Sequence, residues 1–170
     1  DGTDGTSVSR AVLTSPALLA DRQGVYALLT TNELMNVTVP DAAGNVTMSL
    51  DLVTEAERNE KWFIVLASGP GLTPQEVQDY RRNTLGSTSS YAALYYPYIR
   101  ISDPVTDLPV NVPPGGHIVG IYARTDTTKS VAKTPAGVED GRINFSIGLE
   151  RNLEFAEIDI LHPYQVNSLV

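Results

Sequence analysis

A continuous apolar run, KWFIVLA at residues 61–67, constrains the fold more than any other stretch of this sequence. The run has the length of one β-strand, and its apolar residues do not alternate with polar ones. Both faces of such a strand must be buried, which is typical of a parallel sheet covered by helices on both sides. Because strand-like and helical patterns alternate along the chain, we expect an α/β layered domain with a mainly parallel sheet flanked by helices.

The helical patterns carry clear end signals. Asn45 can cap a helix that continues to about Arg58. Thr73 caps the clearest helix, with Pro74 at its first position and Gly86 beyond its end. Shorter helices are expected near 8–12 and 16–20, one helical turn after residue 24, and a helix over 153–163 that ends at a proline.

The remaining strands and loops follow from the same patterns. Further strands are expected at 36–40, 142–148 and 166–170. YAALYYPYIRI at 91–101 reads as one strong strand in which Pro97 removes a ladder donor, so a bulge or a sheet edge is expected there. The sequence predicts loops or connectors at 1–7, 103–114 and 129–141.

The segment VPPGGHIVGIYARTD, residues 112–126, predicts a helix that begins near the prolines, although its β-branched residues leave a strand possible. On a helix Gly116 and Gly120 would clear one face for a neighbour to approach closely. We expect Ile118, Ile121 and Tyr122 to form a buried stripe. His117 is expected to be a cap or an interface residue, and Arg124 and Asp126 are expected to form a polar clamp on the next loop.

Composition narrows the class of protein. We expect the 170 residues to form a single domain, and 42% of them are hydrophobic, as in globular proteins. A formal net charge of −8 makes direct DNA or RNA binding a poor hypothesis. The chain has no cysteine, and no apolar run reaches the roughly 18 residues needed to span a membrane. The first residue is not Met and the last run is strand-like, so we expect a fragment of a longer polypeptide.

No catalytic or cofactor-binding motif emerges. PPGGH and SGPGLT lack the spacing and the lysine of phosphate-binding loops. No GxSxG turn presents a nucleophile, Ser146 and Ser168 lie in strand-like runs, and His162 precedes Pro163 as a helix-end cap. The acidic residues considered as metal ligands are scattered: Glu55, Glu57, Asp103, Asp126 and Asp159. We therefore expect no catalytic residue, no cofactor and no metal.

Two other patterns have a structural and a functional interpretation. Asn36, Asn45 and Asn144 begin glycosylation sequons, which we interpret as structural unless the protein is secreted by a eukaryote. YAALYYPY places four tyrosines within eight residues. Tyrosines favour protein interfaces, but a sheet surface packed under a helix is about equally compatible with them.

Four co-linear segments together resemble contractile phage tail sheath proteins. In this chain the four segments are YAALYYPYIRISDP (91–104), PPGGHIVGIYARTD (113–126), KSVAKTPAG (129–137) and LHPYQVNSLV (161–170). In the family, the last three of these segments have the forms PPSGHxAGxYARTD, RGVWKAPAN and LNPxGVNxIR. The upstream segments DGTDGT, GVYALL and NVTVPDA match as well, so the resemblance extends over nearly the whole chain. Its structural motif residues include Pro113, Pro114 and Pro135.

The chain departs from the family pattern at four positions. Gly115 replaces a serine, Ala132 a tryptophan, Gly137 an asparagine and His162 an asparagine. These differences identify a diverged member and put the contacts of the 129–137 loop in question.

The resemblance implies a structural role. Sheath subunits form stacked hexameric rings around a tail tube and contract to drive the tube through a host envelope. The matching region is subtilisin-like without a catalytic triad. The family's strand-exchanging arms and its tube-contacting C-terminal domain are not visible here, so the isolated chain is expected to be monomeric. The resemblance also implies location in the virion, after assembly in the host cytoplasm.

Two alternatives stay open. A subtilisin-like or other α/β hydrolase would be labelled by a serine-directed phosphonate. A sheath subunit of a bacterial contractile injection machine, such as a pyocin, would differ in host but not in mechanism.

Overall fold

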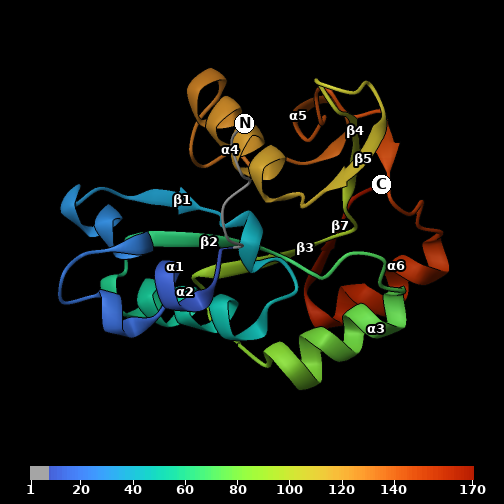
Figure 1. Ribbon diagram of the computed structural model, residues 1–170. Coiled ribbons are helices and arrows are strands. Elements are labelled where there is room, and N and C mark those ends of the chain that lie inside the picture. The colour runs from blue at the N-terminus through green and yellow to red at the C-terminus, as the bar shows by residue number, and fades with distance from the viewer. Residues whose placement is uncertain (1–7) are drawn as a thin grey trace.

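A four-stranded parallel sheet forms the centre of the molecule (Figure 1). The computed structural model describes residues 8–170, so the loop expected at 1–7 lies outside the described residues. The strand order is β1-β2-β3-β7, with β1 (Met35–Val37), β2 (Trp62–Ala67), β3 (Ala92–Tyr96) and β7 (Val166–Ser168). The mainly parallel α/β sheet predicted from the sequence is confirmed.

The apolar run at 61–67 forms the strand that the pattern predicts. In β2, Ile64 is fully buried toward one face and Val65 is 2% exposed toward the other. The side chain of Ile64 joins the larger core, and that of Val65 joins a second cluster with Ile118 and Ile121. Since successive strand residues point to opposite faces, an uninterrupted apolar run is what a doubly covered strand requires.

Helices cover both faces of the sheet. In Figure 1 α4 and α5 lie above it, and α2, α3 and α6 lie below it. The α-helices are α1 (Arg10–Leu13), α2 (Val46–Asn59), α3 (Pro74–Asp79), α4 (Gly115–Thr128), α5 (Gly137–Asp140) and α6 (Phe155–Leu161). The 3-10 turns are η1 (Pro16–Leu18), η2 (Gly24–Thr30), η3 (Pro40–Ala42) and η5 (His162–Tyr164), and η4 (Tyr80–Leu85) is a π-helical continuation of α3.

The capping signals act as predicted. The Asn45 side chain accepts a hydrogen bond from the Met48 N–H, 3.1 Å away, at the start of α2. Thr73 and Glu76 form a reciprocal capping box at the start of α3. These contacts satisfy amide groups that the first helical turn leaves without a partner, which fixes where each helix begins.

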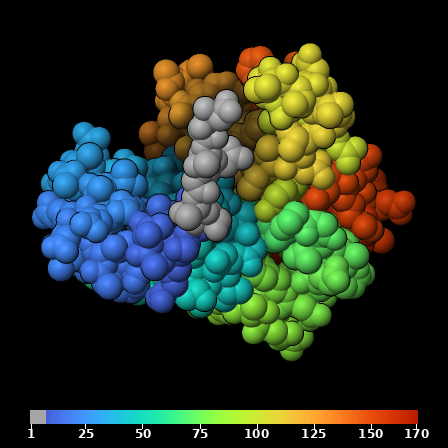
Figure 2. All heavy atoms as spheres, in the orientation of Figure 1, coloured from blue at the N-terminus to red at the C-terminus, as the bar shows by residue number. Residues whose placement is uncertain are grey.

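The prediction of one strand over 91–101 is wrong. The chain leaves the parallel sheet at Pro97, and β4 (Ile99–Ser102) belongs to a second, antiparallel sheet with the order β5-β4-β6. The segment expected as a connector contains β5 (Pro109–Val112), which pairs with β4 as a hairpin. Pro97 therefore marks the change of sheet, rather than a bulge or an edge. The yellow atoms of this hairpin occupy the upper right of the face in Figure 2, above the green atoms of α3.

The strand expected over 142–148 is mostly irregular. Only β6 (Gly148–Leu149) pairs, with β4. Phe145 has φ +63° and is 93% exposed. A positive φ interrupts an extended strand, and the apolar pattern of RINFSIG cannot reveal such a turn.

Candidate functional site

The segment 113–126 forms the helix that the sequence predicts and begins where its prolines end. Pro114 is the N-cap residue of α4, and its carbonyl oxygen accepts the amide of Ile118 at 3.0 Å. Pro113 precedes it at the end of the β5 segment. A proline is tolerated here because the first helical residues have no amide partner within the helix.

Gly115 is the glycine of α4 that allows close packing within residues 8–170, and the close approach expected at Gly116 and Gly120 is not made there. A Cβ placed on either Gly116 or Gly120 would meet nothing within 4 Å, so these glycines face open space. A Cβ on Gly115 would lie 2.0 Å from the Thr38 Oγ1. The helix therefore approaches the loop after β1 at its first turn, and no other element of the described part of the chain packs against Gly116 or Gly120.

The apolar stripe of α4 packs on the sheet as predicted. Ile118 and Ile121 are each 5% exposed and contact Val65 of β2. The hydroxyls of Tyr122 and Tyr95 are hydrogen-bonded to each other, which joins α4 to β3. Burial raises the pKa of Tyr95 well above its usual range, and the partner hydroxyl raises it further. This pair is a packing contact between the helix and the sheet.

Arg124 clamps the following loop, but Asp126 takes no part in the clamp. The Arg124 Nη2 donates to the carbonyl oxygens of Asp140 (2.9 Å) and Arg142 (2.8 Å). The Lys129 ammonium lies 2.5 Å from the Asp140 carboxylate and lowers the pKa of that carboxyl. Asp126 is exposed on the rim of a cavity of about 320 Å³ that the Pro135 loop also lines. The sequence indicated the clamp, but it could not identify carbonyl partners 16 and 18 residues away.

The two histidines lie far from a catalytic arrangement. His117 is half-buried on α4, and His162 is exposed where α6 gives way to η5. Among residues 8–170, neither histidine forms a hydrogen bond with a serine or a carboxylate, and no cluster of three or more potential metal ligands is present. Within the same range, no helix is both long and apolar enough for a bilayer crossing.

Two of the acidic residues considered as metal ligands form separate local contacts instead. Glu55 binds Arg58 at 2.6 Å, and Asp103 accepts from the amide of Val105 at 2.7 Å. That backbone hydrogen bond lowers the pKa of Asp103.

The tyrosine-rich segment is buried more than it is exposed. Tyr96 is 0% exposed and Tyr98 6%. The Tyr96 hydroxyl donates to the Leu72 carbonyl at 2.7 Å, and burial raises its pKa to about 12. Of the two interpretations of these tyrosines, packing inside the domain holds for Tyr96 and Tyr98.

Comparison with known proteins identifies the fold. No protein-family model matches the chain, and no curated protein sequence matches it. A solved structure, the anti-feeding prophage helical sheath in its contracted state, matches 95% of this chain with a TM-score of 0.67 and 22% sequence identity. The chain spans about 41% of the length of that sheath protein. The resemblance seen in the sequence motifs is thus confirmed at the level of the fold: this chain has the fold of part of a contractile sheath protein.

Proposed function

We propose that the chain is the central part of a subunit of a contractile sheath. The observation that supports this best is the fold match over 95% of the chain, to a protein that forms a helical sheath. The co-linear motifs support it independently, since they are features of the amino-acid sequence and not of the fold.

The proposed work of the subunit is mechanical. Copies polymerise around a tail tube in stacked hexameric rings, and contraction changes the contacts between copies while each body stays rigid. The two well-packed cores on either side of the sheet suit a rigid body. In this proposal no cofactor takes part, because the energy that drives contraction is stored in the contacts between subunits. The domain spans 1–170, and the arms and tube-contacting domain belong to other parts of the subunit.

The host machine is either a phage tail or a related injection particle. Assembly occurs in the producing cell, and the finished sheath functions in the released particle. The isolated chain is monomeric in this proposal, because strand exchange by the arms is a β-strand addition that it cannot make.

Electron microscopy of the full-length protein tests the proposal. We expect tubes or stacked rings, and a monomer by light scattering for the 170-residue chain alone. Discrete monomers of the full-length protein at every salt and protein concentration would contradict it.

A structural role also predicts no hydrolytic activity. A serine-directed phosphonate should not label the protein, and His117→Ala should not change that result. Stoichiometric labelling that is lost in His117→Ala would favour the hydrolase instead.

A further inference from the structure

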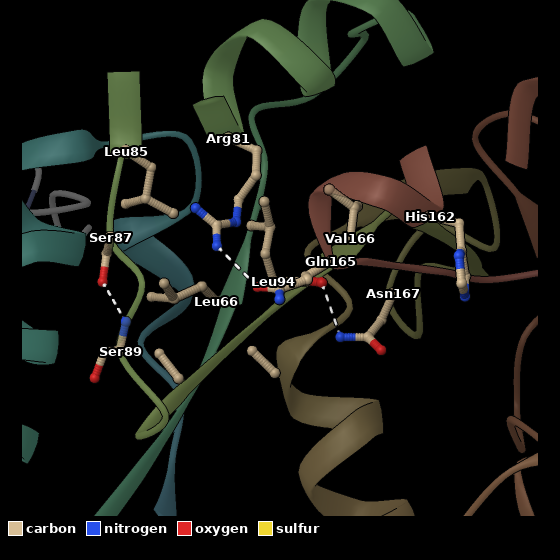
Figure 3. A pocket seen from close by; sticks show the side chains of 12 residues that line it. Leu66, Arg81, Leu85, Ser87, Ser89, Leu94, His162, Gln165, Val166 and Asn167 are labelled. Atoms are coloured by element: carbon tan, nitrogen blue, oxygen red, sulfur yellow. Dashed lines mark hydrogen bonds between the residues drawn. The ribbon is translucent and has the colours of Figure 1, made fainter. Parts of the chain in front are cut away.

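A donor-rich cavity lies under the sheet, on the side away from α4. Its volume is about 350 Å³, and it lies between η4, the loop before β3 and the turn before β7 (Figure 3). The apolar part of its lining comes from Leu66, Leu85, Leu94 and Val166, which belong to the larger core. One side of the cavity is formed by Ala92 and Ala93 at the start of β3. These two residues pair with β2 on one edge, but on the other edge the pairing with β7 begins only at Leu94.

Most polar groups that line this cavity can donate hydrogen bonds, and the amides of Gln165 and Asn167 also bring acceptor oxygens. Arg81 reaches in from η4 toward Gln165, with 3.4 Å between Nη2 and Oε1, a long bond that leaves most of its five N–H groups free (Figure 3). The Ser87 and Ser89 oxygens accept main-chain amides at 3.2 Å each, so their own hydrogens are free to donate. His162 lies on the opposite side.

Among residues 8–170, no acidic residue lines this cavity, although the chain carries 20 acidic against 12 basic residues. A guanidinium with free donors, two hydroxyls and an apolar side form a site for a carboxylate joined to a small apolar group. Charge complementarity therefore points to an acidic, partly apolar segment as the occupant.

The single helical turn of α5 (Gly137–Asp140) offers such a segment. Val138 is 95% exposed, and the Glu139 side chain is 92% exposed with one cation 3.9 Å away. Arg124 and Lys129 hold the base of the turn, which reduces the conformational entropy lost when its tip binds.

The turn cannot reach the cavity of its own molecule. The turn is held by α4 on one face of the sheet, and the cavity is enclosed by η4 and η5 on the other. A contact between two different patches is heterologous, and such contacts generate rings or open helical polymers. We propose that the 137–140 turn of one copy docks in the Arg81 cavity of the next, with the Glu139 carboxylate on the Arg81 guanidinium. This deepens, and rests on, the proposed sheath function.

Charge exchange in the full-length protein tests the contact. Arg81→Glu should raise the protein concentration needed for tubes at least tenfold, and so should Glu139→Arg. The double variant Arg81→Glu with Glu139→Arg should form tubes at nearly the wild-type protein concentration, because the two opposite charges are again paired with their positions exchanged. Arg82→Glu is the matched control: the residue is the next one along η4, is exposed and does not line the cavity, so its tubes should form as in the wild type.

Cysteine cross-linking tests the geometry separately. These 170 residues contain no cysteine, so Ser87→Cys and Val138→Cys introduce one thiol at the cavity and one at the turn, and each single variant serves as the control for thiols elsewhere in the full-length protein. Mild oxidation of mixed copies should give inter-copy disulfides in assembled particles, whereas Thr31→Cys with Val138→Cys should give none. Normal tubes from Arg81→Glu, failure of the double variant to recover, or no disulfide between positions 87 and 138 in assembled particles would each overturn the docking.

The two proposals fail in different ways. If the wild-type protein forms no tubes, the sheath proposal fails. The docking is then tested only by cross-linking of the protein in concentrated solution. A specific disulfide between the cysteines introduced at positions 87 and 138 then supports the docking, and the absence of that disulfide overturns it. If tubes form without that disulfide, the sheath proposal stands and the docking is wrong.

Discussion

Replacing Gly115 with alanine should destabilise the domain, whereas the same change at Gly116 should stabilise it. The new Cβ of Gly115→Ala would lie 2.0 Å from the Thr38 Oγ1 and 3.1 Å from its Cβ. The Thr38 hydroxyl donates to the Val65 carbonyl at 3.0 Å, so moving the side chain away breaks a half-buried hydrogen bond.

The magnitude follows from three contributions. Overpacking costs about 1–3 kcal/mol, and a lost hydrogen bond costs about 1 kcal/mol. The better helix propensity of alanine returns about 1 kcal/mol. The free energy of unfolding should therefore fall by about 1–3 kcal/mol. With a urea m-value of about 2 kcal/mol/M, the unfolding midpoint should fall by about 0.5–1.5 M.

Urea unfolding followed by the fluorescence of Trp62 measures this shift. Trp62 is the only tryptophan and is 2% exposed, so its emission reports the loss of the core. Gly116→Ala and Gly120→Ala are matched controls, since a Cβ there meets nothing within 4 Å, and each should raise stability by about 0.5–1 kcal/mol.

A double-variant cycle identifies the cause. In a Thr38→Ala background the closest clash is gone, so Gly115→Ala should cost less than half as much as in the wild type. The reasoning is refuted if Gly115→Ala is as stable as Gly116→Ala, or if its cost is unchanged by Thr38→Ala.

Three further perturbations test other parts of the structure. Tyr122→Phe should cost about 1–2 kcal/mol in urea unfolding because it leaves the half-buried Tyr95 hydroxyl without its partner, and adding Tyr95→Phe should recover part of that loss. Arg124→Ala should speed tryptic cleavage in the 129–142 loop but change the unfolding midpoint little, because the two carbonyl contacts of Arg124 hold the loop and not the core. An unchanged rate of cleavage would contradict the clamp. The Thr73 amide and hydroxyl lower the pKa of Glu76 below 4.5, so the contribution of Glu76 to stability is complete above pH 4.5 and is lost as the pH falls through the lowered pKa. Glu76→Gln should therefore make the unfolding midpoint less sensitive to acid. An unchanged dependence of the midpoint on pH would contradict this assignment.

The sequence by itself determined the parts whose signals are local. The doubly buried β2, the capped helices α2 and α3, and the helix after Pro114 each depend on residues within a few positions of one another, through periodicity, caps and prolines. The sheath resemblance also came from the sequence, because its motifs are co-linear segments.

Only the tertiary structure decided what depends on residues distant in the chain. Pro97 separates two sheets, which shows only when β5 and β6 pair with β4. Gly115, rather than Gly116 or Gly120, is the packing glycine because Thr38, from a loop far earlier in the chain, lies against it. The Arg81 cavity likewise combines residues of η4 and of the turn before β7, which are distant in the sequence. Contacts of this kind depend on how the elements are placed in space, which no local pattern of residues encodes.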